Sequence, residues 1–281
     1  MEVAILLTCF NRKAKTKACL ENLRTQNIPA EFSFRVFICD DGSSDGTSEM
    51  LKKDFPDVCV VKGNGKLFWG GGMSKAWKLA KETAQFDYYL WLNDDTFLLP
   101  DALSALFSEY KSIGRTAILT AACKEPGTFK FTYGGLMDEY IPLIPNGELQ
   151  EVRFINGNLV LIPKEIEEKI GVISSLYTHY LGDFDYGLRA LRAGFPCFTT
   201  SKYLAECESN PFPNWSDPNL PLRKRWKIAH DVKGRAVSEY ISFKSYHYGK
   251  IVGFKSLIDI YLKLFFTDSY VDFRNKILNK T

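Results

Sequence analysis

Residues 1–123 alternate between short apolar runs and segments in which apolar residues recur with helical spacing. Apolar runs of strand length lie at Val3–Leu7, Phe34–Cys39, Val58–Val61, Tyr88–Leu92 and Ala117–Ala122. Helical segments lie between them, at Lys15–Gln26, Ser44–Asp54, Met73–Ala84 and Asp101–Ser112. Because strands that alternate with helices form βαβ units, this pattern predicts an α/β fold. Its central sheet would be mostly parallel and Rossmann-like, with helices on both faces.

Beyond residue 123 the alternation becomes irregular. Residues 127–150 are rich in Gly, Pro, Tyr and Phe, which predicts hairpins and loops of the kind that cover a site. A strand at Arg153–Ile162, helices at Lys164–Ile170 and His179–Ala193, and a helical tail from Pro221 are expected to follow. We therefore predict one domain at 1–220, divided near residue 123, and a helical C-terminal extension at 221–281.

The C-terminal extension is basic. From Pro221 onward the chain has 13 Lys and Arg against 5 Asp and Glu, a balance of +8, so the remainder carries −5 of the net +3. This balance suits an anionic partner such as a lipid surface or a diphosphate, and a solvated basic helix face has the same composition. The segment Ile251–Phe266 is too short and too charged to span a bilayer. It predicts an amphipathic helix that either packs on the sheet domain or attaches to a membrane surface.

The overall composition is that of a soluble globular protein, with 46% hydrophobic and 25% charged residues. The seven cysteines are scattered without a CxxC pair, and several lie inside apolar runs. This pattern is typical of reduced, buried thiols in the cytoplasm rather than of a disulfide framework or a zinc site. The N-terminal run MEVAILLTCF has no basic n-region and no small-residue cleavage site, so we interpret it as the first strand rather than a signal peptide.

Two of the predicted strands end in adjacent carboxylates. Asp40 and Asp41 follow one strand, and Asp94 and Asp95 follow Asn93 at the end of another. In open α/β sheets, ligands bind at the C-terminal edge of the strands. Carboxylate oxygens at such an edge can ligate Mg²⁺ or Mn²⁺, although Asn and Asp are also common in simple turns.

A third signal is the segment GNGKLFWGGGMSKAW, Gly63–Trp77. Its three consecutive glycines precede the predicted helix at Met73 and permit close backbone approach, so Gly70 and Gly71 are expected beside a diphosphate or a sugar. A structural turn would explain the glycines but not the adjacent Trp69. We therefore expect Trp69 to lie at the site.

Four motifs in this order resemble those of the family-2 glycosyltransferases, which have the GT-A fold. TCFNR at Thr8–Arg12 resembles the opening strand and loop, CDDGSSDGT at Cys39–Thr47 the nucleotide-binding turn, and LNDDT at Leu92–Thr96 the DxD metal motif. LGDFDYGLRALRAGF at Leu181–Phe195 is similar to the element that carries the catalytic base. The WGGG loop resembles that of the rhamnosyl- and galactofuranosyl-transferase-like members.

The resemblance implies a role for each matching residue. The nucleotide would contact Thr8, Phe10, Arg12, Asp40, Asp41, Lys66 and Asp94. Donor sugar and acceptor would lie beside Trp69, Gly70, Gly71, Asn156 and Gly182. Asp95 would ligate a Mg²⁺ or Mn²⁺ ion that bridges two phosphates, and Asp183 would be the general base.

The chain departs from the family pattern at three places. Asn93 stands where the DxD motif has its first acid, so metal contact at that end falls to Asn93, Asp94 or water. Gly182 stands where a Glu usually precedes the base. The metal-binding His that some relatives carry further along is absent, and Glu206 or Glu208 is expected to replace it.

These residues predict a metal-dependent, inverting glycosyltransferase with a nucleotide-binding half at 1–123 and an acceptor-binding half at 124–220. Its donor would be a UDP- or dTDP-sugar, and its acceptor a glycan or lipid-linked glycan in bacterial surface polysaccharide synthesis. It would act in the cytoplasm or at the inner face of the plasma membrane, without a nucleic-acid partner. The alternatives are a nucleotidyltransferase, whose Gly-rich loop after the first strand is missing here, and a non-catalytic homologue.

Overall fold

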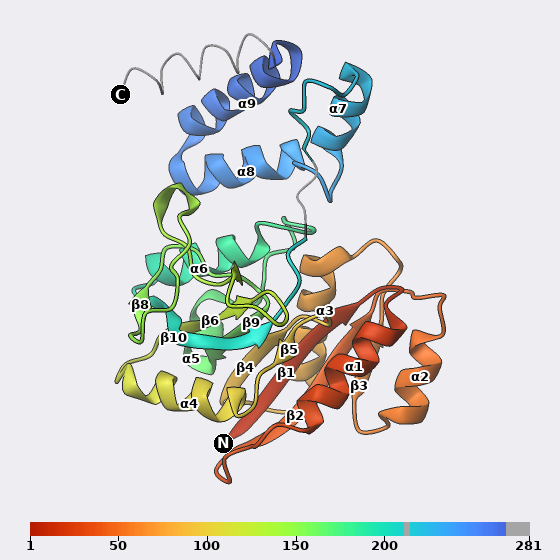
Figure 1. The fold of residues 1–281 in the computed structure, drawn as a ribbon, viewed down its shortest axis with the longest axis vertical. Coiled ribbons are helices and arrows are strands. Elements are labelled where there is room, and N and C mark those ends of the chain that lie inside the picture. Colours follow the sequence, from red (N-terminus) through yellow and green to blue (C-terminus); the bar gives the residue numbers. More distant parts are fainter. Residues whose placement is uncertain (211–213, 268–281) are drawn as a thin grey trace. The chain divides into compact units, whose positions relative to one another are not determined.

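The computed structural model describes residues 1–210 and 214–267 (Figure 1). In the first part of the chain the elements are β1 (Glu2–Cys9), α1 (Lys13–Arg24), β2 (Ser33–Asp40), α2 (Thr47–Asp54), β3 (Cys59–Lys62), α3 (Phe68–Thr83), β4 (Tyr88–Leu92), β5 (Phe97–Leu98), α4 (Ala102–Ser112) and β6 (Ile118–Lys124). These are followed by β7 (Phe131–Tyr133), a 3₁₀ turn (Asp138–Tyr140), β8 (Gln150–Glu151), β9 (Leu159–Pro163), α5 (Lys164–Ile170), α6 (Gly182–Arg192) and β10 (Cys197–Glu206). Helices α7 (Leu222–His230), α8 (Val237–Tyr248) and α9 (Lys250–Phe265) complete the described chain.

The strands form one mixed sheet with the order β3-β2-β1-β4-β9-β6-β10-β5, and β7 and β8 pair at its side. Strands β3, β2, β1 and β4 are parallel neighbours, as are β6 and β10. Strand β9 lies antiparallel between β4 and β6, so these two groups of parallel strands point the same way. The predicted α/β fold with a mostly parallel sheet is confirmed.

Alternate side chains of β1 face two different cores. Val3, Ile5 and Leu7 pack with α1, α2 and α4, whereas Ala4 and Leu6 pack on the other side with α3, α5 and α6. Because successive side chains of a strand point to opposite faces, this division shows that helices cover both faces of the sheet (Figure 1).

Three large rings fix the elements that carry the site. Trp77 of α3, Trp91 of β4 and Tyr186 of α6 are buried, with ring centroids 5.1–5.8 Å apart. Truncation of such a ring to alanine typically costs about 3–5 kcal/mol, because it leaves a cavity. The packing of these rings therefore fixes the positions of α3, β4 and α6 relative to one another.

The structure corrects several predicted boundaries. Helix α3 begins at Phe68 rather than Met73, so Gly70 and Gly71 lie in its first turns and not in a preceding loop. Glycine has low helix propensity, and close packing against other segments maintains the helix here. Helix α6 begins at Gly182 rather than His179, because Leu181 before it has a left-handed φ of 82°.

The predicted strand at Arg153–Ile162 is also shorter than expected. Strand β9 begins only at Leu159. The N–H of Asn158 donates to Oδ1 of Asn156 at 3.2 Å, and this local turn competes with strand pairing. The segment before β9 is thus released from the sheet as a loop. Strand β10 is absent from the predicted elements.

The chain divides into two compact units, Met1–Ser209 and Asn210–Thr281, so the second unit begins before the predicted position of 221. Within the described part of the second unit, α7, α8 and α9 enclose a small core of Ala229, Val237, Ile260 and Leu264. The division of the first unit into nucleotide- and acceptor-binding halves stays a prediction.

Candidate active site

The C-terminal edge of the parallel strands gathers the predicted site residues. Strands β1, β2 and β4 run in the same direction and end at Cys9, Asp40 and Leu92. The loops that follow them carry Arg12, the second aspartate of the pair at 40–41, and the sequence Asn93-Asp94-Asp95. Two predicted motifs, one after β1 and one after β4, therefore meet in space.

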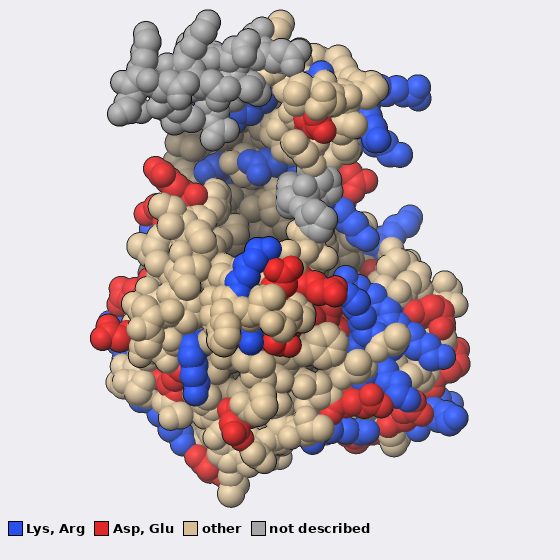
Figure 2. All heavy atoms as spheres, in the orientation of Figure 1, with Lys and Arg blue, Asp and Glu red and all other residues tan. Residues whose placement is uncertain are grey.

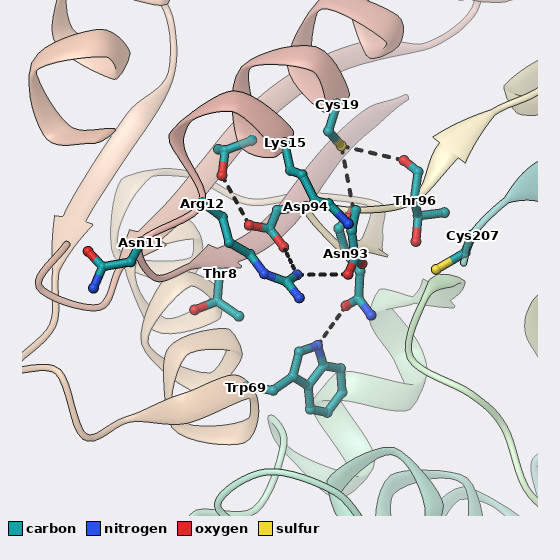
Figure 3. A network of polar contacts seen from close by, with 12 residues as sticks. Thr8, Asn11, Arg12, Lys15, Cys19, Trp69, Asn93, Asp94, Thr96 and Cys207 are labelled. Carbon is teal, nitrogen blue, oxygen red and sulfur yellow. Dashed lines mark hydrogen bonds and ion pairs between the residues drawn. The ribbon is translucent and has the colours of Figure 1, made fainter. Parts of the chain in front are cut away.

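Arg12 bridges the two acids of the DxD-like motif. Its Nη1 lies 2.9 Å from Oδ1 of Asp94 and 2.7 Å from Oδ2 of Asp95 (Figure 3). The other oxygen of Asp94 accepts a hydrogen bond from the hydroxyl of Thr16 on α1 at 3.0 Å. Burial raises the pKa of the Asp94 carboxyl above its ordinary value, and the adjacent guanidinium opposes that shift. One cationic group thus occupies the position between two carboxylates.

Asn93 turns away from this ion pair. Its Oδ1 accepts the indole N–H of Trp69 at 2.7 Å (Figure 3), as the dashed line there marks. Its Nδ2 donates to Oδ1 of Asn158. The backbone N–H of Asn93 also donates to the carbonyl of Asn158 at 3.0 Å. Asn93 therefore ties the end of β4 to the loop before β9. The sequence singles out Asn156-Gly157-Asn158 as a segment whose amides could face sugar hydroxyls, but it does not predict this bond between Asn158 and Asn93.

The ring of Trp69 packs between β4, the loop before β9 and the start of α6. Its ring packs edge-to-face on Trp91 with centroids 5.7 Å apart. A Cβ on Gly157 would lie 2.3 Å from the Trp69 ring, so Gly157 has to be glycine for this packing. A Cβ on Gly182 would lie 3.4 Å from the same ring, an ordinary contact distance, and 3.1 Å from Cδ1 of Ile173.

Asp183 lies in the first turn of α6. Its Oδ2 accepts the N–H of Gly157 at 3.0 Å, and its Oδ1 accepts the N–H of Phe184 at 2.8 Å. Burial raises the pKa of Asp183 to about 6, against the opposing effect of these two N–H groups. A carboxylate with this pKa is ionised at neutral pH and still able to take up a proton.

The helix behind Asp183 is braced by a second acid. Asp185 is buried, and its Oδ2 lies 2.8 Å from Nε of Arg189. The two terminal nitrogens of Arg189 donate to the carbonyls of Ile170 at 2.5 Å and Val172 at 3.1 Å. These partners give Asp185 and Arg189 a structural role.

The pair Asp40–Asp41 organises loops. Oδ1 of Asp40 accepts the N–H of Ser43 at 2.9 Å, within the turn before α2. The two oxygens of Asp41 accept four backbone N–H groups at 2.9–3.1 Å, from Asn64, Gly65, Leu67 and Phe68. Both carboxyl groups are buried. Contact of either one with a nucleotide base stays a prediction.

The loop held by Asp41 brings other predicted residues to the same edge. Phe10 is 43% exposed, and a Cβ on Gly65 would lie 3.9 Å from its ring. Lys66 is exposed in this loop. Thr8, at the end of β1, packs against Gly72 of α3, where a Cβ would lie 2.0 Å from the threonine Oγ1.

The first two glycines of the GGG run pack inside the protein. The N–H of Gly70 donates to the carbonyl of Thr178 at 2.8 Å, and a Cβ there would lie 2.2 Å from the carbonyl of Tyr177. A Cβ on Gly71 would lie 3.2 Å from Cβ of Leu67. The contact with the Tyr177 carbonyl requires glycine at position 70 without a ligand, whereas the Leu67 side chain only crowds position 71. A sugar-side role for both residues stays a prediction.

A metal-binding role for Glu206 or Glu208, in place of the missing histidine, stays a prediction. Glu206 at the end of β10 pairs with Lys124 at 3.3 Å, and Glu208 pairs with Lys15 at 3.1 Å. Within residues 1–210 and 214–267, no group of three or more His, Cys, Asp or Glu side chains is placed to hold a metal ion. Asp94 and Asp95 are the adjacent carboxylates that follow β4 at this edge. Oδ1 of Asn156 accepts the N–H of Asn158 at 3.2 Å, and contact of Asn156 with the donor sugar or the acceptor stays a prediction.

Solved structures with the same fold are glycosyltransferases. The mannosyltransferase PcManGT from Pyrobaculum calidifontis, in complex with GDP-Man and Mn²⁺, has a TM-score of 0.56 and 15% identity, covering 93% of this chain and 69% of its own. GalNAc-T7 with UDP, GalNAc and Mn²⁺ has a TM-score of 0.57 and 12% identity, covering 77% of this chain and 46% of its own. S. aureus TarS 1-349 in complex with UDP-GlcNAc has a TM-score of 0.56 and 15% identity, covering 85% of this chain and 66% of its own.

At these identities the likeness establishes the GT-A fold alone, and this chain spans less than half of the GalNAc-T7 structure. No curated protein matches the sequence. The family model described as Glycosyl transferase family 2 matches residues 4–171, more than half of the 281 residues, and the chain therefore belongs to glycosyl transferase family 2.

Proposed function

We propose that this protein is a metal-dependent, inverting glycosyltransferase that moves a sugar from a UDP- or dTDP-linked donor to a hydroxyl of a glycan or lipid-linked glycan. The observation that carries the proposal is the connection between the two carboxylate sites. Asn93, beside Asp94 and Asp95, is bonded to Asn158, and the neighbouring Gly157 is bonded to Asp183. An acid pair for the donor and a separate base for the acceptor are thereby held on one support.

The acid pair fits a divalent ion. Mg²⁺ and Mn²⁺ sites in phosphate-transferring enzymes often use one or two carboxylates and complete their shell with substrate phosphate and water. Asp94 and Asp95 supply those carboxylates once Arg12 is displaced, and the Mn²⁺ in the PcManGT and GalNAc-T7 complexes supports the same use. When bound, the ion would neutralise charge on the departing diphosphate.

Arg12 has a role of its own in this proposal. Both of its bonds to the acid pair use the same nitrogen, Nη1. A guanidinium carries five N–H donors in a fork that matches phosphate oxygens. The arriving diphosphate can therefore take Arg12 as a partner while Asp94 and Asp95 turn to the metal.

Asp183 is the proposed base. The acceptor hydroxyl attacks C1 of the donor sugar, the bond from C1 to the diphosphate oxygen breaks, and Asp183 takes the hydroxyl proton. Attack from the face opposite the leaving group inverts the configuration at C1. No covalent enzyme intermediate is formed.

The finer assignments extend this proposal. The Trp69-Gly-Gly-Gly run supports placement in the rhamnosyl- and galactofuranosyl-transferase-like subgroup, with a role in bacterial surface polysaccharide synthesis at the cytoplasmic side. The seven cysteines are free thiols, and six of them are buried. Among the described helices, none combines the length and the apolar character needed to cross a bilayer.

A panel of nucleotide sugars tests the function directly. We expect a UDP- or dTDP-sugar, together with Mn²⁺ or Mg²⁺, to raise the melting temperature and to be hydrolysed slowly without acceptor. A ligand at 100 times its Kd adds about 2.7 kcal/mol of apparent stability when it binds only the folded state. Stabilisation by a purine nucleoside triphosphate and a sugar phosphate, without response to nucleotide sugars, would instead indicate a nucleotidyltransferase.

The nucleotide turn gives a more specific prediction. Replacement of Asp40 and Asp41 by alanine should weaken UDP or dTDP binding by about tenfold or more, because the turn and the loop at 64–68 lose their charged acceptors. Titration calorimetry measures this change. Asp54→Ala is the control, since it removes a carboxylate from the other end of α2, where Asp54 pairs with Lys17. Unchanged UDP affinity in the double variant would contradict the placement of the nucleotide.

We further propose that the second unit attaches to an anionic lipid surface. Helix α9 buries Gly253, Ile260 and Leu264, yet it also exposes a second apolar stripe of Ile251, Phe254, Ile258, Leu262 and Phe265. Basic side chains Arg223, Lys224, Arg225 and Lys227 gather on α7 (Figure 2). Apolar side chains that enter the interface and nearby cations that attract anionic headgroups are the two components of such attachment.

Vesicle sedimentation tests the attachment. The protein should sediment with phosphatidylglycerol-containing vesicles at low salt and be released as salt rises, because the attraction is screened. Phe254→Ser combined with Ile258→Ser should weaken sedimentation, and Ile28→Ser, at an exposed residue of the first unit, should not. Equal sedimentation with phosphatidylcholine and phosphatidylglycerol vesicles would contradict the proposed attachment to anionic lipid.

A further inference from the structure

Three aromatic rings form a cluster that none of the proposed donor contacts uses. Phe154 and Phe184 lie with ring centroids 5.0 Å apart. Tyr140 covers both, 5.0 Å from Phe154 and stacked on Phe184 at 5.7 Å with an interplanar angle of 19°. Phe154 is buried, whereas Tyr140 keeps 40% of its surface exposed. The cluster therefore presents a tyrosine ring to solvent on a firm apolar base.

The cluster is built from the two segments that hold Asp183. Phe184 follows Asp183 in the chain, and its N–H donates to that carboxylate at 2.8 Å. Phe154 precedes the loop in which Gly157 donates to the other oxygen of the same carboxylate at 3.0 Å. The position of Tyr140 is thereby coupled to the position of the proposed base.

The loop that carries Tyr140 is held in an unusual conformation. Glu139 and Tyr140 have left-handed φ values of 60° and 61°, which are uncommon for residues other than glycine. A hydrogen bond and an ion pair hold the loop against residues 153–154. The N–H of Leu136 donates to the carbonyl of Phe154 at 2.9 Å, and Asp138 pairs with Arg153 at 2.9 Å. Such backbone strain persists only where surrounding contacts impose it, and it is concentrated at functional sites.

We propose that Tyr140, supported by Phe154 and Phe184, is the platform on which a sugar ring of the acceptor binds. This proposal rests on the proposed function and names the acceptor class, a glycoside rather than a bare alcohol or a protein side chain. The apolar C–H face of a pyranose or furanose ring matches the exposed part of the tyrosine ring. Stacking there positions an acceptor hydroxyl toward Asp183.

The test separates acceptor binding from donor chemistry. The probes are methyl glycosides of common hexoses and deoxyhexoses, studied by saturation-transfer NMR with UDP and Mn²⁺ present and by transfer kinetics with the donor that stabilises the protein. Tyr140→Ala should raise the KM of the glycoside about tenfold and remove its NMR signal, because the stacking surface is lost. Tyr140→Phe should keep both values, and donor hydrolysis without acceptor should be unchanged in each variant.

Ile28→Ala is the matched control, because Ile28 is exposed to a similar extent, 46%, in the loop between α1 and β2. If Tyr140→Ala binds glycosides and transfers sugar as the parent does, or if no glycoside binds the parent, the platform is wrong even though donor hydrolysis continues. If the parent neither binds nor hydrolyses any nucleotide sugar, the proposed function fails, and retained, Tyr140-dependent glycoside binding would still support the platform.

Discussion

Asp183→Asn should lower kcat by about 10² to 10⁴, the usual contribution of a general base. Asparagine is nearly isosteric, and its single side-chain oxygen can accept one of the two N–H groups of Gly157 and Phe184, so the start of α6 should keep its conformation with one hydrogen bond fewer. It cannot take a proton from the acceptor. Donor affinity should barely change, because the nucleotide contacts lie on other elements. Steady-state kinetics with separate titration of donor and acceptor measures both quantities.

The pH dependence of the parent enzyme gives an independent readout. Burial raises the pKa of Asp183 to about 6, and the carboxylate is the active form, so kcat should rise as pH increases through about 6 and then level off. The variant should lack this rise. Because the native state holds the proton more tightly than the unfolded chain, with its ordinary pKa of 3.8, the parent also loses stability between these two values as pH increases.

Stability therefore provides the control. Above pH 6 the parent carries a partly buried charge that Asp183→Asn lacks, and removal of this charge offsets the loss of one accepted hydrogen bond, so the variant should melt close to the parent while being nearly inactive. Asp185→Asn should show the opposite combination of lower stability and retained activity. Its melting temperature should fall because the substitution disturbs the buried pair with Arg189. Parent-like turnover by Asp183→Asn, or loss of its nucleotide binding, would exclude Asp183 as the base and direct attention to Asp185 or His179.

The sheet could be predicted because its information is local. Apolar runs such as Val3–Leu7 and Tyr88–Leu92 have strand length and end in polar residues, and the observed β1 and β4 contain them. The meeting of the loops after β1 and β4 follows from the parallel direction of these strands. The ion pairs of Arg12 with Asp94 and Asp95 thus follow from the order of the strands in the sheet, and neither motif alone predicts them.

Other features depend on contacts that no local pattern records. Helix α3 begins at Phe68, so the glycines lie inside the helix. Tyr177 and Thr8 lie too close to this turn for any side chain at Gly70 and Gly72. The position of the Trp69 ring requires glycine at 157, a packing constraint between segments far apart in the chain. Tyr140 lies in a Gly- and Pro-rich segment, and its packing on Phe184 comes from residues more than 40 positions apart in the chain.

Asp95→Ala should abolish metal-dependent transfer, with a loss of about 10² or more in kcat/KM, because one of the two carboxylates available to the ion is removed. Asp94, the carboxylate that would remain, is more deeply buried than Asp95 and accepts a hydrogen bond from Thr16, so it is less available to the ion. Donor affinity should fall together with activity, since the ion joins protein and diphosphate. Full activity of the parent enzyme in excess EDTA would contradict the use of a metal.

A matched variant separates charge removal from metal loss. Asp57 also pairs with an arginine of α1, Arg24 at 2.5 Å, so Asp57→Ala deletes a similar ion pair away from the DxD-like motif and should leave activity unchanged. The arginine at the motif adds a further expectation. Because Arg12 occupies the space between Asp94 and Asp95, Mn²⁺ should bind weakly to the protein alone and more tightly when UDP provides Arg12 with a phosphate partner. Calorimetric titration of Mn²⁺ with and without UDP measures this coupling, and equal affinities would mean that Arg12 does not compete with the ion.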